Sequence, residues 1–134
     1  MRAAVFAFLL LVAGIVPAHA QQNPMIGVWV AQVNDVNGGP QQVTVVIQAN
    51  GTYSEQWRGA NNLLTNTGRW FVAGGDVVRF EIVDWQPRQW CGPLGCNQLQ
   101  RPPNSTVRIQ FRGPNVLVAM PVQGGGGIIY QRAQ

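Results

Sequence analysis

The sequence predicts an all-β domain, an antiparallel up-and-down barrel of about eight strands. Three observations predict it. No stretch of about ten residues beyond residue 20 has helical periodicity, short segments alternate polar and apolar side chains, and Gly, Asn and Pro separate those segments. An open sheet of this size exposes two edges. A barrel of about eight strands removes both edges and encloses either its own side chains or one small ligand.

Four strands are expected in the first half of the domain. The second is the clearest, because Val43, Val45 and Ile47 fall on one face and the residues between them on the other. Asn50-Gly51 then gives the strongest short hairpin signal in the chain. These four strands are expected at residues 25–34, 41–49, 52–58 and 66–73.

Four further strands are expected in the second half. The fifth has the cleanest period of two, with Val78, Phe80 and Ile82 on the inward face and Arg79 and Glu81 on the outward face. Turn residues separate the strands that follow. The last four strands are expected at residues 77–84, 105–112, 116–121 and 128–132.

The segment from Asp84 to Pro103 lacks clean alternation and holds both cysteines of the chain. Cys91 and Cys96 bracket Gly92-Pro93-Leu94-Gly95, which can turn the backbone sharply, so we expect a local disulfide. Zinc is the competing interpretation. Two thiolates with no histidine beyond residue 20 cannot complete a tetrahedral site. We therefore expect no metal site and no cofactor.

The first 20 residues have the form of a signal peptide. Arg2 precedes a nearly continuous apolar run over residues 3–16, and Pro17-Ala18-His19-Ala20 supplies an A-x-A cleavage site. We expect cleavage near Ala20 and one monomeric domain, residues 21–134, in the periplasm or outside the cell. A membrane anchor is the alternative, but the run is shorter than the roughly 18 to 20 residues that a span needs. We expect neither stable membrane insertion nor nucleic-acid partners.

Short motifs give the chain a family resemblance. Gly27-Val28-Trp29 has the G-x-W form of the first strand of lipocalin-like, or calycin, barrels. Gly51-Thr52-Tyr53 and Gly68-Arg69-Trp70 are similar to the repeated turn-and-strand motifs of bacterial lipocalin-like domains, and Tyr130-Gln131-Arg132 ends the last strand. The domain as a whole therefore resembles that family.

The resemblance implies that Trp29 packs under Arg132 and closes the barrel floor, a structural role. Core packing is expected for Trp29 and Trp70. The chain departs from the family in its shorter length, in its lack of a C-terminal helical pattern and in a disulfide confined to one loop. An exported barrel with one disulfide is also similar to the small periplasmic inhibitors of secreted metalloproteases, although those place their cysteines differently.

The domain is poor in catalytic groups. It has no histidine beyond residue 20 and no lysine, and both thiols are expected to be oxidised. Asp84 has the parity of the buried face, so a hydrolase that uses Asp84 and Glu55 as a carboxyl pair is one hypothesis. An ion pair between Asp84 and Arg88 that anchors the loop is the other. We expect a protein without enzymatic activity.

Trp85 and Trp90 lie in the loop region, where a large apolar ring is hard to bury. With Arg88 and Leu94 they are expected to form a binding face at the barrel mouth. Two functions fit. The protein holds a small apolar or amphipathic ligand at that mouth, or it presents the disulfide-pinned loop, residues 85–103, to a partner such as a periplasmic protease or an envelope protein. An interior cavity favours the first function, and a filled interior with an exposed aromatic loop favours the second.

Overall fold

The computed structural model describes residues 22–35 and 39–134. The predicted signal peptide, residues 1–20, and its cleavage near Ala20 lie outside these ranges. Within them no helix is long and apolar enough to cross a membrane. The described strands are β1 (Gly27–Asp35), β2 (Gly39–Ile47), β3 (Thr52–Arg58), β4 (Leu63–Gly74), β5 (Val77–Gln86), β6 (Gln89–Gly92), β7 (Gly95–Gln98), β8 (Ser105–Phe111), β9 (Val116–Pro121) and β10 (Ile128–Arg132).

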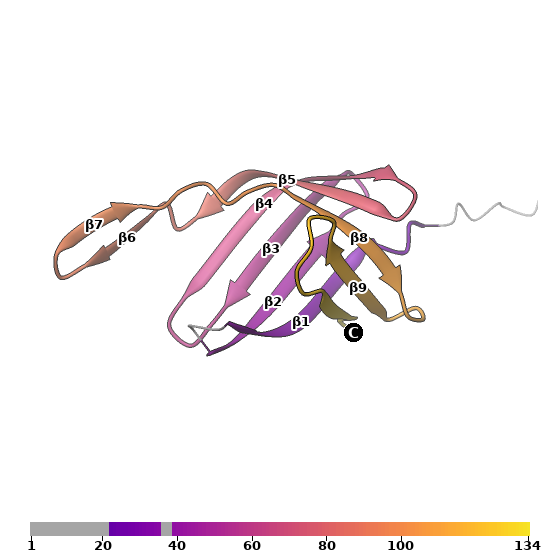
Figure 1. The fold of residues 1–134 in the computed structure, drawn as a ribbon, viewed down its shortest axis with the longest axis horizontal. Helices are drawn as coiled ribbons and strands as arrows, with labels where there is room; N and C mark the ends of the chain where they lie inside the picture. The colour runs from indigo at the N-terminus through magenta and orange to yellow at the C-terminus, as the bar shows by residue number, and fades with distance from the viewer. Residues whose placement is uncertain (1–21, 36–38) are drawn as a thin grey trace, which may run out of the picture.

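Eight of these strands form one closed antiparallel barrel (Figure 1). The order around the barrel is β1-β10-β9-β8-β5-β4-β3-β2, so each strand pairs with its neighbour along the chain once β6 and β7 are passed over. Pairing of β10 with β1 closes the ring. The predicted all-β, up-and-down barrel is therefore confirmed.

The other two strands, β6 and β7, form a separate hairpin that the sequence did not predict. It extends away from the barrel (Figure 1) and carries the predicted disulfide, with Cys91 and Cys96 directly opposite each other in register. Nearly every residue of the two strands is exposed. A strand with no buried face has no reason to alternate polar and apolar residues, so its period-two signal is absent.

The barrel strands lie close to the predicted ranges. The largest shift is at β4, which begins at Leu63 rather than at residue 66. The turn before it is tight, because the Gly59 N–H donates to the Asn62 carbonyl over 3.0 Å. Residues expected in that turn pair with β3 instead, Leu63 with Arg58 and Leu64 with Trp57.

The inward faces of the strands carry the core. Trp29 and Val43 are fully buried. On β5, Val78 and Ile82 are buried and Phe80 is half-buried, as the alternation predicted. Trp70, expected in the core, is only half-buried: it packs at the edge of the core cluster, and its indole Nε1 donates to the Gln48 carbonyl at 2.9 Å.

β1 and β10 join along a short seam that Arg132 reinforces. Two residue pairs define their register, against nine for β1 and β2. The guanidinium carbon of Arg132 lies 4.2 Å from the centroid of the Trp29 ring, and the Arg132 Nη1 and Nη2 groups donate to the carbonyls of Ile26 (2.9 Å) and Pro24 (2.7 Å). Gly27 makes room, because a Cβ there would lie 2.5 Å from Arg132 Nη1.

β5 continues beyond the end of its pairing with β8, which stops at Phe80. Side chains replace the missing strand at Ile82. The Ile82 N–H donates to Asn104 Oδ1 (2.9 Å), and Arg101 Nη2 donates to the Ile82 carbonyl. The two prolines between Arg101 and Asn104 have no N–H to donate, so this segment cannot add a regular strand to the sheet.

Candidate functional site: a cavity inside the barrel

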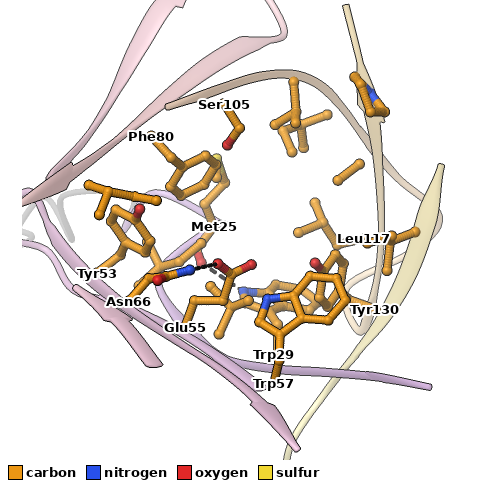
Figure 2. Close-up of a pocket in the computed structure, with 18 of the residues that line it drawn as sticks. Met25, Trp29, Tyr53, Glu55, Trp57, Asn66, Phe80, Ser105, Leu117 and Tyr130 are labelled. Carbon is orange, nitrogen blue, oxygen red and sulfur yellow. Dashed lines mark hydrogen bonds between the residues drawn. The ribbon is translucent and has the colours of Figure 1, made fainter. Parts of the chain in front are cut away.

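A cavity of about 380 Å³ lies inside the barrel, lined by side chains from all eight barrel strands (Figure 2). Met25 and the fully buried Trp29 line its floor, near the seam of β1 and β10. At the opposite end, which we call the mouth, the lining comes from Pro102 and Pro103 before β8 and from Gly126 in the connection between β9 and β10. The sequence did not decide between a filled barrel and a barrel with a cavity, and the structure has the cavity.

Most of the cavity wall is apolar. Aliphatic side chains come from β2, β5, β8, β9 and β10, and the aromatic lining residues are Trp29, Tyr53, Trp57, Phe80 and Tyr130. The Tyr53 and Phe80 rings meet edge to face, with centroids 4.9 Å apart. Tyr53 also covers its cross-strand partner Gly68, where a Cβ would collide with the Glu81 carbonyl. Glycine is needed at this close approach of β4 and β5.

β3 brings a carboxylate into this apolar wall. Tyr53, Glu55 and Trp57 share the inward face because residues two apart in a strand point the same way. Glu55 is half-buried, and its carboxylate points into the cavity (Figure 2). Its cross-strand partner Asn66, which is buried, donates from Nδ2 to Glu55 Oε2 over 3.0 Å.

Within residues 22–35 and 39–134, no arginine forms an ion pair with Glu55. The ion pairs of these residues lie outside the cavity and join Arg79 to Glu81, Arg88 to Asp84 and Arg108 to Asp76. The amide of Asn66 orients the carboxylate but carries no charge. Glu55 therefore gives the cavity wall one carboxylate that, among the described residues, is in no ion pair.

Two phenols share the cavity with Glu55. Burial raises the pKa of Tyr130 well above its ordinary value, and the negative charge of Glu55 raises it further. The pKa of Tyr53 is raised by the same two causes in the same order, with a smaller opposing effect from Arg101. Both phenols stay protonated at neutral pH and can donate hydrogen bonds.

The site shows no metal-binding arrangement: among the described residues, no group of three or more His, Cys, Asp and Glu comes together. The polar side chains that line the cavity are a single carboxylate, two phenols, the Ser105 hydroxyl and the Asn66 amide, and the indoles of Trp29 and Trp57 each add one N–H donor. This set can orient a ligand through hydrogen bonds and charge.

Asp84 does not have the inward orientation that its parity predicted. Thr67 pairs with Asp84, but Gly68 pairs with Ile82, so Val83 is an extra residue on β5 at this β-bulge. Beyond the bulge the alternation is broken, and both Val83 and Asp84 are exposed. Glu55 lines the cavity and Asp84 does not, so the structure does not assemble the hypothetical carboxyl pair.

Asp84 instead pairs with Arg88, the other interpretation of this residue. The hydrogen bond from Arg88 and, second, the N–H of Trp85 lower the pKa of Asp84 below its ordinary value. The Arg88 guanidinium also stacks over the half-buried Trp85 ring at 3.7 Å from its centroid. Trp85 and Arg88 thus form a local cluster where β5 leads into the hairpin.

Trp90 and Leu94 lie on the hairpin itself. The Trp90 ring covers Gly92 but is 61% exposed, and Leu94 at the turn is fully exposed. Neither residue lines the cavity, and neither do Trp85 and Arg88. The structure therefore brings Trp85 and Arg88 together but separates the predicted binding face from the cavity, and the role of these four residues in binding stays a prediction.

The sequence pointed to Glu55 only as half of the hypothetical carboxyl pair with Asp84, and it did not point to Asn66 at all. The available signal was parity, because Tyr53, Glu55 and Trp57 alternate with Ser54 and Gln56 on a strand whose range was predicted correctly. A charged residue between two aromatic residues on an inward face indicates a polar group in a cavity.

No family model matches the chain, and no curated protein matches it either.

Proposed function

We propose that this protein is an exported, non-enzymatic binding protein that holds a small apolar or amphipathic ligand inside its barrel. The observation that carries the proposal is the 380 Å³ cavity with a mainly apolar wall. Small-molecule sites in proteins have volumes from about 300 to 1,000 Å³ and combine apolar walls with a few polar groups. The cavity is at the lower end of that range, which favours a small ligand.

Two further observations support the proposal. Three prolines line the cavity near its mouth, Pro102 and Pro103 in the irregular segment before β8 and Pro121 at the end of β9, whereas the floor is sealed by Trp29 and the strand seam. A ligand would therefore enter from the mouth. The disulfide between Cys91 and Cys96 is consistent with an oxidising compartment outside the cytoplasm.

The lipocalin-like assignment belongs to the same proposal. It is supported by the closed eight-stranded barrel and by the stacking of Arg132 on Trp29, the closing contact that the G-x-W resemblance implies. Ligand binding inside the barrel is the function that this resemblance favours.

Binding of a fluorescent apolar probe, N-phenyl-1-naphthylamine, tests the proposal. We expect saturable binding by the wild type and loss of binding by Ala119→Phe, which fills part of the cavity wall. A Trp90→Ser, Leu94→Ser double variant, altered only on the exposed hairpin, serves as the matched control and should bind normally. Unchanged binding by a folded Ala119→Phe variant would mean that the probe binds outside the barrel, and the proposal would be wrong.

The exposed hairpin favours a second candidate, a protein-interaction module. Trp90 and Leu94 expose large apolar surfaces on a hairpin clamped by a disulfide, and a pre-ordered loop loses little entropy on binding. A periplasmic protease or an envelope protein would be the partner. Cross-linking in the host compartment tests this function. If the hairpin binds a partner protein, the Trp90→Ser, Leu94→Ser variant should lose the cross-linked partner. The Ala119→Phe variant should retain it.

A further inference from the structure

We infer that the cavity selects ligands with a cationic or strongly hydrogen-bond-donating head group, an ammonium above all, and discriminates against carboxylates such as fatty acids. The inference rests on the proposed function and specifies the ligand class. Glu55, on the β3 wall of the cavity, carries it.

The position of Glu55 gives the first argument. Its carboxylate points into the cavity, held by a 3.0 Å hydrogen bond from Asn66, its only side-chain hydrogen-bond partner among the described residues (Figure 2). Asn66 engages one oxygen, Oε2, and leaves the other free to accept from a ligand. A carboxylate in an apolar wall is favourable only when it is paired with a charge or with hydrogen-bond donors. A ligand ammonium would supply both.

The aromatic lining gives the second argument. Trp57 follows Glu55 by two residues on the same strand face, and Tyr130 approaches the same region from β10 (Figure 2). The electron-rich faces of such rings attract an ammonium but not a carboxylate. The charge and the rings therefore favour the same kind of head group.

The neighbouring phenols give the third argument. The charge of Glu55 contributes to the raised pKa of both Tyr53 and Tyr130, so its field extends across the cavity. A fatty-acid carboxylate in this space would be repelled by Glu55. No arginine lines the cavity, and the positive charge of Arg101 opposes Glu55 at Tyr53 only as the smaller effect.

The apolar part of the cavity wall determines what the body of the ligand can be. Met25, Ile109 and Leu117 line the cavity toward the floor, and Val107 and Ile128 line it higher up. These side chains are apolar and offer no hydrogen-bond donor. The ligand class is thus a small amphiphile, with an apolar body on the aliphatic wall and an amine at Glu55.

Three probes with the same ten-carbon chain test the inference: decylammonium, decanol and decanoate, each used below its micellar concentration to displace N-phenyl-1-naphthylamine. We expect the wild type to bind decylammonium about tenfold or more tightly than decanol, because the ammonium adds attraction between opposite charges to the hydrogen bond that either head group can donate to Glu55. Decanoate should bind most weakly. Glu55→Gln keeps the shape of the side chain and an oxygen for Asn66, and should abolish the preference for decylammonium over decanol. Decanol should still bind this variant, more weakly than it binds the wild type, because its hydroxyl keeps an acceptor oxygen but loses the charge on it.

Glu81→Gln is the matched control, because it removes the same charge from the outer face of β5, which β4 separates from β3, and there Glu81 pairs with Arg79. It should keep the decylammonium preference. If all three probes bind the wild type equally and Glu55→Gln changes nothing, the inference is wrong and the proposed function stands. If none of the probes binds, both are wrong. A Glu55→Gln variant that still binds decanol and keeps the far-ultraviolet dichroism spectrum of the wild type is folded, so its loss of selectivity cannot be attributed to unfolding.

Discussion

The guanidinium of Arg132 stacks on the ring of Trp29 with 4.2 Å between its central carbon and the ring centroid, at the point where the first and last barrel strands meet. The contact fastens a seam with only two residue pairs in register. Trp29 itself is fully buried, and its Nε1 donates to the Met25 carbonyl at 2.8 Å. Floor, seam and core therefore depend on one indole ring.

Trp29→Ala is expected to lower the free energy of unfolding by about 3 to 5 kcal/mol, because burial is lost and a cavity remains. Trp90→Ala should cost less than about 1 kcal/mol, since its ring is mostly in water. Urea denaturation of both variants, followed by far-ultraviolet circular dichroism, measures the difference. Equal losses of unfolding free energy in the two variants would contradict the assignment of Trp29 to the core.

Replacement of Cys91 and Cys96 by serine is expected to lower the free energy of unfolding by about 2 kcal/mol or less, because the disulfide closes a short ring. The hairpin pairs with no barrel strand among the described residues, so the dichroism spectrum should stay that of a β-barrel. Binding of N-phenyl-1-naphthylamine by the double serine variant should also be retained. Collapse of the barrel in that variant would show that the hairpin is part of the core.

Asn104→Ala is expected to cost about 1 to 3 kcal/mol, because it leaves the Ile82 N–H without its acceptor beside the cavity. Hydrogen exchange at the Ile82 amide should accelerate in this variant. Asn104→Asp, which keeps an acceptor oxygen at the same position, is the matched control and should protect that amide. Equal protection in the alanine variant would mean that the side chain does not replace the missing strand.

The two tyrosines, the only ones in the chain, are expected to titrate late in alkaline solution. Their folded-state pKa is raised by burial and by Glu55, so the native protein holds these protons more tightly than the unfolded chain does. Their contribution to stability is complete below the unfolded pKa of about 10 and is lost as the pH rises toward the folded value.

Phenolate absorbance near 295 nm measures this titration, and it should appear at higher pH in the native protein than in urea. Glu55→Gln should shift the native titration toward lower pH, because it removes one of the two causes of the rise. Superimposable native and urea titrations would contradict the burial of both phenols in the cavity wall.

The sequence predicted the barrel well where one strand face is buried. On β2 and β5 the alternation of Val43, Val45, Ile47 and of Val78, Phe80, Ile82 follows directly from inward and outward environments. It failed at Val83, because a bulge inserts one residue through strand pairing that no local pattern encodes. The prediction for Asp84 was wrong for that reason.

The candidate site was predictable only in part. The gathering of aromatic residues in one irregular segment predicts a binding face of Trp85, Arg88, Trp90 and Leu94. Proximity in sequence, however, does not reveal which end of the barrel or which cavity a segment faces. Glu55 and Asn66 meet across β3 and β4 through a register that depends on the length of the turn between them. That turn proved shorter than expected, so their pairing could not be inferred.

The hairpin of β6 and β7 also has a consequence for how the chain can change in length. Its strands share no ladder with the barrel among the described residues, and the Leu99 N–H bonds to the Arg88 carbonyl at its base, over 2.8 Å. The ends of the insert are thus held together independently of what lies between them. Doubling the length of such a loop costs only about 0.6 kcal/mol of closure entropy. Residues 89–98 are therefore a replaceable module, where insertions, deletions or a grafted epitope can be accommodated while the register of all eight barrel strands is unchanged.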